Sequence, residues 1–170
     1  MFWFSLFNNF DHIYGACAVR IHRIYCKIRR IPDISIITDF ISIGGSTTIE
    51  GLSKNGVSAI VDLRIEDDDD PIQIEKYSID YLKIGIVDKG IPSEIQAKEV
   101  TNWIHKKINT GSKVFVHCNL GRGRAATMAC LYLISKGMTV SDSISLVKKN
   151  RKYVYLNKKQ SKFIQEFKIL

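Results

Sequence analysis

One short segment of the chain combines a nucleophile with glycines and arginines. Cys118 is followed within six residues by Gly121, Arg122, Gly123 and Arg124. A cysteine thiolate is a strong nucleophile, and an arginine guanidinium can bind two phosphate oxygens at once. Glycines allow backbone N–H groups to approach an anion without a Cβ clash. The segment therefore predicts a site where a thiolate attacks a phosphate ester.

The elements around this segment would place it at a helix N-terminus. Val114–His117 is short, apolar and rich in β-branched residues, and Arg124 opens a run that is apolar almost all round to about Lys136. A turn between a strand and a helix collects backbone N–H groups and the positive end of the helix dipole. We expect this field to favour the Cys118 thiolate and to bind a phosphoryl group. The candidate substrate-binding residues are Asn119, Leu120, Gly121, Arg122, Gly123 and Arg124.

Both the nucleophile and the residue before it have competing interpretations. His117 could act as a base, but adjacent residues of a strand point to opposite faces, which favours a role in positioning the loop. Cys118 itself could be an inert buried thiol. An inert thiol would not explain the glycines and arginines that follow it. A zinc site is disfavoured, because no partner ligands occur at the usual spacing, and no metal is predicted.

The rest of the chain after Pro32 alternates short strands with helices. Strands are predicted at Asp39–Ile43, Val57–Leu63, Ile79–Ile86 and Val114–His117. Helices are predicted at Thr47–Lys54, 93–110, Arg124–Lys136, Ser141–Lys149 and Lys158–Ile169. The loop Asp67–Asp70, between the second and third predicted strands, is acidic and is expected to be solvated. This alternation predicts an α/β fold with a central, mostly parallel sheet flanked by helices on both faces.

Composition limits the class of partner. The chain has 170 residues and a net charge of +8, which favours anionic partners such as a membrane surface, phosphorylated molecules or nucleic acid. The four cysteines show neither a paired metal-binding spacing nor a disulfide framework. We therefore expect a reducing, cytoplasmic compartment. Nucleic acid would explain the charge but not the Cys118 segment, so no nucleic-acid partner is expected.

Residues 1–32 form a basic extension ahead of the expected catalytic domain at residues 33–170. On a helix, one stripe is apolar and the adjacent stripe is basic. The apolar stripe holds Cys17, Ile21, Ile24, Ile28 and Ile31, and the basic stripe holds Arg20, Arg23, Lys27 and Arg30. Such a helix could lie on an anionic membrane as a peripheral contact, dock on the domain, or serve as a targeting segment. The pattern alone does not choose among these three.

The pattern His117-Cys118-x-x-Gly121-x-x-Arg124 resembles the signature of the cysteine-dependent dual-specificity and tyrosine phosphatases. The resemblance extends over about residues 38–168, and Val87–Ser93 resembles the general-acid loop of small archaeal-type and lipid-acting members. It implies a tyrosine-phosphatase-like fold without a cofactor. It also implies that Cys118 forms a phosphocysteine, that Arg124 binds phosphate and stabilises the transition state, and that Asp88 protonates the leaving oxygen and later activates water.

Without the resemblance, the residues alone do not choose Asp88 over Asp62, Glu66 or Asp80 as the acid. One position also departs from the family pattern. Members usually have serine or threonine after the loop arginine, where the hydroxyl helps the thiolate to leave, and this chain has Ala125. We expect an active enzyme in which hydrolysis of the phosphoenzyme limits turnover.

The resemblance implies a phosphomonoester hydrolase acting on phosphorylated proteins. An alternative is a phospholipid head-group phosphatase at a membrane surface, because the Gly121–Arg124 loop resembles that of phosphatidylglycerophosphate phosphatases. A phosphate-binding module with little turnover would fit Ala125 but not the intact Cys118 and Arg124. A sulfurtransferase also uses a cysteine in an anion-binding loop, but it would not need the acid loop.

Overall fold

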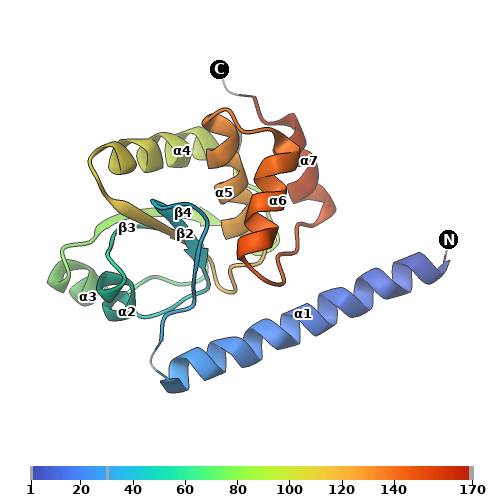
Figure 1. Cartoon of the computed structure of the whole chain (residues 1–170), viewed down its shortest axis with the longest axis horizontal. Coiled ribbons are helices and arrows are strands. Elements are labelled where there is room, and N and C mark those ends of the chain that lie inside the picture. The colour runs from blue at the N-terminus through green and yellow to red at the C-terminus, as the bar shows by residue number, and fades with distance from the viewer. Residues whose placement is uncertain (1, 30, 169–170) are drawn as a thin grey trace.

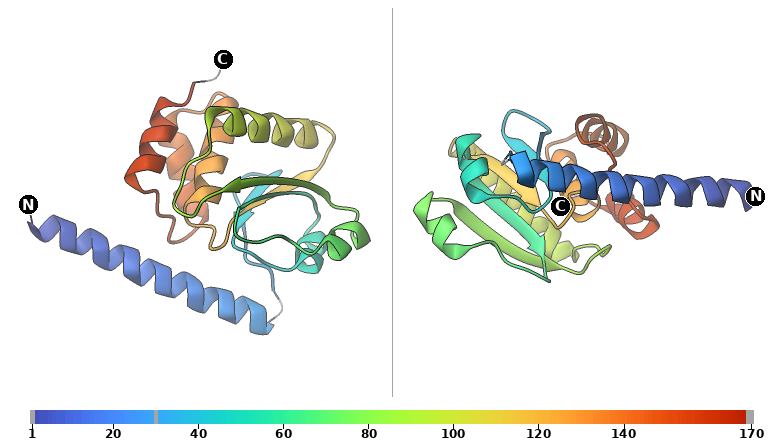
Figure 2. Two further views of the ribbon diagram at one scale, coloured as in Figure 1. Left: turned by 180° about the vertical axis from the view of Figure 1, so that it is seen from behind. Right: turned by 90° about the horizontal axis from the view of Figure 1, so that it is seen from below.

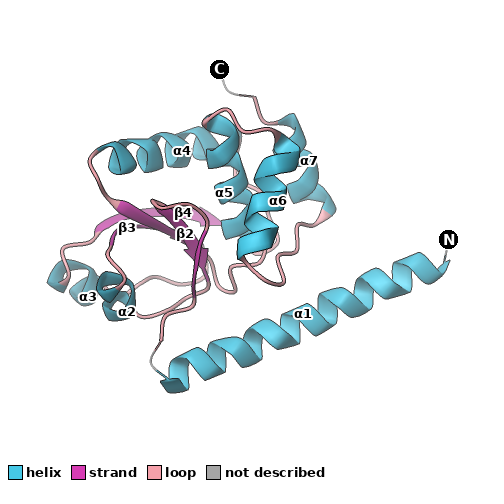
Figure 3. Cartoon of the chain, in the orientation of Figure 1, coloured by secondary structure: helices cyan, strands magenta, loops and turns pink. Residues whose placement is uncertain are grey.

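The computed structural model describes residues 2–29 and 31–168. Its sheet has five strands in the order β1-β2-β5-β3-β4. Figure 3 shows the strands in magenta and the helices around them in cyan. The strands are β1 Ile34–Ile36, β2 Ile41–Gly44, β3 Val57–Arg64, β4 Asp80–Ile86 and β5 Lys113–His117. β1 is antiparallel to β2, and the other neighbouring strands are parallel. The predicted mostly parallel sheet is confirmed.

Helices cover both faces of this sheet, as predicted. They are α1 Phe2–Arg29, α2 Ile49–Lys54, α3 Pro71–Lys76, α4 Glu94–Asn109, α5 Arg124–Ser135, α6 Val140–Asn150 and α7 Lys158–Glu166. α4 to α7 pack on one face, around a core that includes Val114, Val116 and Leu131 (Figure 1). α2 and α3 lie on the other face, around a smaller core with Phe115. Successive side chains of β5 therefore pack alternately into the larger and the smaller core.

Two short elements were not predicted, and one strand is shifted. β1 was missed, and so was α3, although Asp70 caps α3 and Pro71 opens it in a favourable first-turn position. Of the strand expected at Asp39–Ile43, the first two residues instead form a turn, in which the Thr38 hydroxyl accepts hydrogen bonds from two backbone N–H groups. The end expected for the last helix, Ile169, lies outside the described residues.

The central helix α5 fixes the position of the Cys118 segment. Its residues from Arg124 to Ile134 are all buried. Gly137 follows it with a φ of +90°, a left-handed conformation that suits glycine after a helix end. Because β5 and α5 are both inside the core, the six residues that join them are held at both ends.

Helix α1 lies along one side of the α/β domain, and its N-terminal end projects beyond it (Figures 1 and 2). Among the α1 residues whose burial is described, Gly15, Val19 and Cys26 are buried, and they share one side of a helix with about 3.6 residues per turn. The predicted apolar stripe is on the opposite side: Ile24 and Ile28 are 60% and 73% exposed. The helix is therefore docked, but by a different face from its isoleucine stripe. No helix in the described part of the chain is long and apolar enough to cross a bilayer.

Candidate active site

The loop between β5 and α5 wraps around the sulfur of Cys118. The Cys118 side chain is buried, and the Gly121 N–H donates a hydrogen bond to Sγ over 3.3 Å. The loop also joins the end of β2, where the Ser46 N–H donates to the Asn119 carbonyl over 3.0 Å. A backbone donor and a following helix N-terminus both stabilise negative charge on the sulfur.

Gly121 is required by the path of this loop. Its φ is +65°, in the region that side chains rarely adopt. A Cβ placed there would lie 2.4 Å from the Gly44 carbonyl carbon and 2.5 Å from Arg151 Nη2. Both neighbours are buried and cannot move aside. Glycine is therefore the residue that lets the loop pass between β2 and Arg151.

Arg151 supports the loop from behind. Its Nε donates to the Gly121 carbonyl over 2.8 Å, and its Nη2 donates to the Leu120 carbonyl over 2.9 Å. Because these carbonyls turn toward Arg151, the N–H groups of the same peptides turn the other way, and that of Gly121 donates to Cys118. Arg151 thus sets the direction of the loop N–H groups without touching the cavity.

Asp33 completes this support. Both of its carboxylate oxygens accept hydrogen bonds from Arg151, each over 3.0 Å, and Oδ2 also accepts from the Gly45 N–H. Burial acts to raise the pKa of Asp33, but hydrogen bonds and charge from Arg151 outweigh it and hold that pKa below its usual value. The pair is charged and buried, so loss of one partner would leave an uncompensated charge.

Arg124 begins α5 with its guanidinium directed into the site. Nη1 and Nη2 donate to the Glu66 carboxylate over 2.8 and 2.6 Å, and Nη1 also donates to the Ile86 carbonyl. The hydrogen bonds from Arg124 hold the pKa of Glu66 at about 2. In the described part of the chain, Arg124 Nε is buried and has no hydrogen-bond partner. A buried donor of this kind favours an incoming oxyanion.

Asp88 lies beside the same guanidinium. Its Oδ1 is 3.3 Å from Arg124 Nη2, and its side chain is largely exposed. The start of α7 holds the segment that carries it. Asn157 Nδ2 donates to the Lys89 carbonyl over 2.8 Å, and Gln160 Nε2 donates to the Gly90 carbonyl over 3.0 Å. The structure therefore brings Cys118, Arg124 and Asp88 to one place.

The other carboxylates considered as acids are engaged elsewhere. Asp62 is fully buried and accepts hydrogen bonds from Arg64, and Asp80 pairs with Lys107 over 2.6 Å. Glu66 is near the site, but its carboxylate is bound to Arg124. Asp88 is the carboxylate in this set that combines exposure with a place beside the nucleophile loop.

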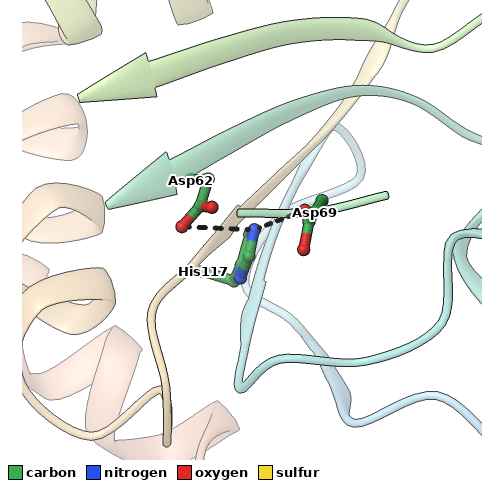
Figure 4. Close-up of side chains that lie close together, drawn as sticks. All are labelled: Asp62, Asp69 and His117. Carbon is green, nitrogen blue, oxygen red and sulfur yellow. Dashed lines mark ion pairs between the residues drawn. The ribbon is translucent and has the colours of Figure 1, made fainter. Parts of the chain in front are cut away.

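His117 faces away from the nucleophile. Its Nε2 lies 3.0 Å from Asp69 Oδ2 and 3.7 Å from Asp62 Oδ1 (Figure 4), and its ring stacks on Phe115. The two carboxylates and the imidazole are close enough together to bind one metal ion. However, Arg64 already donates to both oxygens of Asp62 and to Asp69. The arrangement favours an ionic network that anchors the end of β5 over a metal site.

The acidic segment Asp67–Asp70 is mostly exposed, as expected, but it also forms ion pairs that were not predicted. Asp67 and Asp69 accept hydrogen bonds from Arg64, each over 2.7 Å, and Asp68 pairs with Lys83 over 2.6 Å. Arg64 is almost fully buried, so these carboxylates balance a charge that the fold has removed from water. The sequence did not predict these ion pairs, because the partner cations come from other positions along β3 and β4.

Ala125 lies in the first turn of α5 and is fully buried. Thr127, the next hydroxyl along the chain, is also fully buried, and its Oγ1 has no hydrogen-bond partner in the described part of the chain. Thr127 therefore does not replace the hydroxyl that position 125 lacks. In the described part of the chain, the donor to the Cys118 sulfur is the Gly121 N–H, and the charge of Arg124 also acts on that sulfur.

A cavity of about 420 Å³ opens above Cys118. Five of the six predicted binding residues line it: Asn119, Leu120, Arg122, Gly123 and Arg124. The opposite wall comes from α1, through Ile13, Ala16, Cys17 and Arg20. Sequence reasoning missed this wall, as it missed Arg151 and Asp33. No local pattern signals them, because they lie far from Cys118 along the chain.

Comparisons with known proteins agree with this geometry. Over 77 residues the chain is 39% identical to the phosphatidylglycerophosphate phosphatase PTPMT2 of Arabidopsis thaliana, covering 45% of this chain but only 34% of that protein. Over 128 residues it is 33% identical to the protein tyrosine phosphatase type IVA 3 of Mus musculus, covering 72% of this chain and 71% of that protein. The chain thus spans about a third of the plant relative and most of the mouse one.

Solved structures share the fold. Tk-PTP in its active form superimposes with a TM-score of 0.72 at 24% identity, over 79% of this chain and 95% of that one. PTPMT1 in complex with PI(5)P superimposes with a TM-score of 0.73 at 21% identity, over 79% of this chain and 93% of that one. Residues 41–169 match the family described as the dual specificity phosphatase catalytic domain. Together with the loop that surrounds Cys118, this match shows that the chain belongs to the dual specificity phosphatase family.

Proposed function

We propose that this protein hydrolyses phosphomonoesters through a phosphocysteine intermediate on Cys118. The observation that carries the proposal is the buried Nε of Arg124, which has no hydrogen-bond partner among the described residues. It lies near a sulfur that already accepts a backbone hydrogen bond. A phosphoryl group on Cys118 would give that donor an acceptor. Its other oxygens would meet the loop N–H groups.

The first step transfers the phosphoryl group to sulfur. The Cys118 thiolate forms a P–S bond while the P–O bond to the leaving group breaks, and Asp88 gives its proton to the departing oxygen. Arg124 binds the equatorial oxygens as negative charge builds on them. In the second step the Asp88 carboxylate takes a proton from water. The water oxygen bonds to phosphorus, the P–S bond breaks, and phosphate leaves with the thiolate restored.

The substrate class supported by the longest match is a phosphorylated protein side chain, because the tyrosine phosphatase relative aligns over 72% of this chain. A second candidate is a phospholipid head group at a membrane surface. It is favoured by the exposed isoleucine stripe of α1, which faces away from the domain, and by the cations around the cavity. Exposing such an apolar stripe to water is unfavourable, and inserting it into the surface of an anionic bilayer is favourable.

The chemistry is tested by phosphate release from para-nitrophenyl phosphate. Cys118→Ser should abolish release, and Asp88→Ala should slow it most for substrates with poor leaving groups. Intact mass measurement of rapidly quenched wild-type enzyme should detect one added phosphoryl group, which Cys118→Ser should lack. Wild-type activity in Cys118→Ser would overturn the mechanism.

The substrate class is tested by initial rates at matched phosphate concentration. Phosphotyrosine and phosphothreonine peptides would be compared with phosphatidylglycerophosphate in anionic vesicles. A lipid substrate predicts a vesicle rate well above the peptide rate that collapses when the vesicle surface is diluted with detergent. Vesicle rates no higher than peptide rates would leave phosphoprotein as the substrate class.

A further inference from the structure

The catalytic cavity is larger and more basic than one phosphate group requires. Its volume of about 420 Å³ is in the range of sites that enclose whole small ligands. Four cations line it: Arg20, Lys89, Arg122 and Arg124. Asp88 is the acidic residue among the described residues of its wall. A phosphoryl dianion on Cys118 would be held by Arg124 and the loop, and it would leave the charges of Arg20 and Lys89 for a second anion.

Arg20 and Lys89 are the cations that remain available in that wall. Both are exposed, and within the described part of the chain neither has an ion pair. Arg122 is different, because its side chain is buried and its Nε donates to the Tyr153 carbonyl over 2.9 Å. Burial lowers the pKa of Arg122, and the nearby positive charge of Arg20 acts in the same direction. Like charges gathered here would be stabilised by an anion between them.

The packing of α1 holds Arg20 at this position. A Cβ on Gly15 would lie 2.8 Å from Arg122 Nη2, so the absence of a side chain lets the helix backbone pass close to the loop. Val19 and Cys26 continue the same buried side, and His22 reaches to within 3.8 Å of Asp33. Arg20 is one residue beyond Val19 and therefore points along the flank of the contact, into the cavity wall.

We propose that Arg20, with Lys89, forms a second anion-binding subsite, which takes a phosphate-type group of the substrate while its phosphomonoester binds at Cys118. The ligand class is a molecule that carries two phosphate groups, of which one is a monoester. A guanidinium binds two oxygens of such a group, and Lys89 adds a second charge from the segment that carries Asp88. The inference rests on the proposed function, since the monoester must bind in the loop.

The test compares three probes that differ in their second anion. Para-nitrophenyl phosphate has one phosphate, fructose bisphosphate has two without acyl chains, and dihexanoyl phosphatidylglycerophosphate has two with short acyl chains. The measured quantity is the ratio of kcat/KM for each two-phosphate probe to that for para-nitrophenyl phosphate. Arg20→Ala should lower this ratio about tenfold through KM, because one charge-assisted contact is lost. Lys89→Ala should lower it less, and Arg20→Lys should restore part of it.

Arg29→Ala is the matched control, because Arg29 is exposed on α1 but does not line the cavity. Its ratio should equal that of the wild type. A fall for both two-phosphate probes supports a subsite for phosphate as such, and a fall for the lipid probe alone supports a lipid head group. An equal ratio in Arg20→Ala and wild type for both probes would overturn the subsite.

A binding measurement separates this inference from the proposed function. Calorimetric titration of Cys118→Ser protein with fructose bisphosphate needs no turnover. Combining Cys118→Ser with Arg20→Ala should weaken the affinity for fructose bisphosphate about tenfold. Combining it with Arg29→Ala should leave that affinity unchanged. If the wild type released no phosphate, the proposed function would fail, but the titration would still decide whether the subsite exists. Equal affinities in the two double variants would refute the subsite.

Discussion

The two walls of the cavity are held in different ways. The loop wall is buried, and it is fixed by Arg151, by the end of β2 and by the first turn of α5. The α1 wall rests on Gly15, Val19 and Cys26, and it leaves a row of isoleucines in solvent. The proposed chemistry thus lies where the fold allows little variation. The proposed second anion subsite lies on a helix whose outer residues the core does not constrain.

The largest effect is expected from Arg151→Met, which removes the support of the loop wall. The change leaves Asp33 buried without its partner and frees the carbonyls of Leu120 and Gly121. The free energy of unfolding should fall by about 3–5 kcal/mol. Turnover of para-nitrophenyl phosphate should fall about 100-fold at a temperature where the variant is still folded. Urea unfolding and kcat measure the two losses.

Lys152→Met serves as the neighbouring control, because Lys152 is exposed. It should lose neither stability nor turnover. If Arg151→Met unfolded more easily but kept wild-type kcat, the loop would not depend on Arg151 for its direction, and the contrast between the walls would be lost.

The second effect concerns the outer face of α1. Ile24→Asp combined with Ile28→Asp should weaken binding to anionic vesicles about tenfold, because two apolar side chains no longer enter the interface. Sedimentation with vesicles measures this. The matched control is Ile95→Asp, an equally exposed isoleucine on α4. Equal vesicle binding by wild type and the α1 variant would rule out this face as the membrane contact.

A smaller effect is expected from Ala125→Ser, which adds a hydroxyl next to the departing sulfur. If breakdown of the phosphoenzyme limits turnover, kcat should rise several-fold, about 1 kcal/mol, and the pre-steady-state burst should shrink. Ala126→Ser adds the same group one residue later, at an equally buried position, and should not have this effect. A wild-type enzyme without a burst would contradict this prediction.

The smallest effect concerns the Glu66–Arg124 pair. The folded-state pKa of Glu66, about 2, lies below its unfolded value of 4.5, so the pair stabilises the fold above pH 4.5 and loses this as pH falls toward 2. Because Glu66 is partly exposed, Glu66→Gln should cost less than about 1 kcal/mol at pH 6. Urea unfolding at pH 6 and pH 3 should show the difference from wild type shrinking. A difference that grows on acidification would contradict it.

The parts of the fold that could be predicted are those with a local pattern. β5, the glycine-rich turn and α5 follow one another directly, and the capping boxes at Ser93 and Asn157 start α4 and α7 as expected. β1 is three residues long and offers too few positions to show an alternation. α3 begins at Asp70-Pro71, a recognisable start, but the preceding run of aspartates suggested a loop.

The site residues also divide into those that a local sequence pattern predicts and those that it does not. Cys118 and Arg124 belong to one local pattern, whereas Asp88 needed the family resemblance. Arg151 and Asp33 are 118 positions apart along the chain and meet only after folding. The face by which α1 docks could not be predicted from hydrophobicity. Close approach to Arg122 favours a position with no side chain, Gly15, over the larger isoleucines on the opposite side.

The hydrogen bonds from Asn157 and Gln160 to the segment that carries Asp88 bear on when that segment becomes ordered. Gln160 holds the Gly90 carbonyl, and a Cβ on Gly123 would lie only 3.0 Å from its Nε2. One side chain therefore spans both the acid segment and the nucleophile loop, and it sets the spacing between them before any substrate arrives. The segment that carries Asp88, the proposed acid, is thus positioned when the chain folds and need not be repositioned in each proposed catalytic cycle.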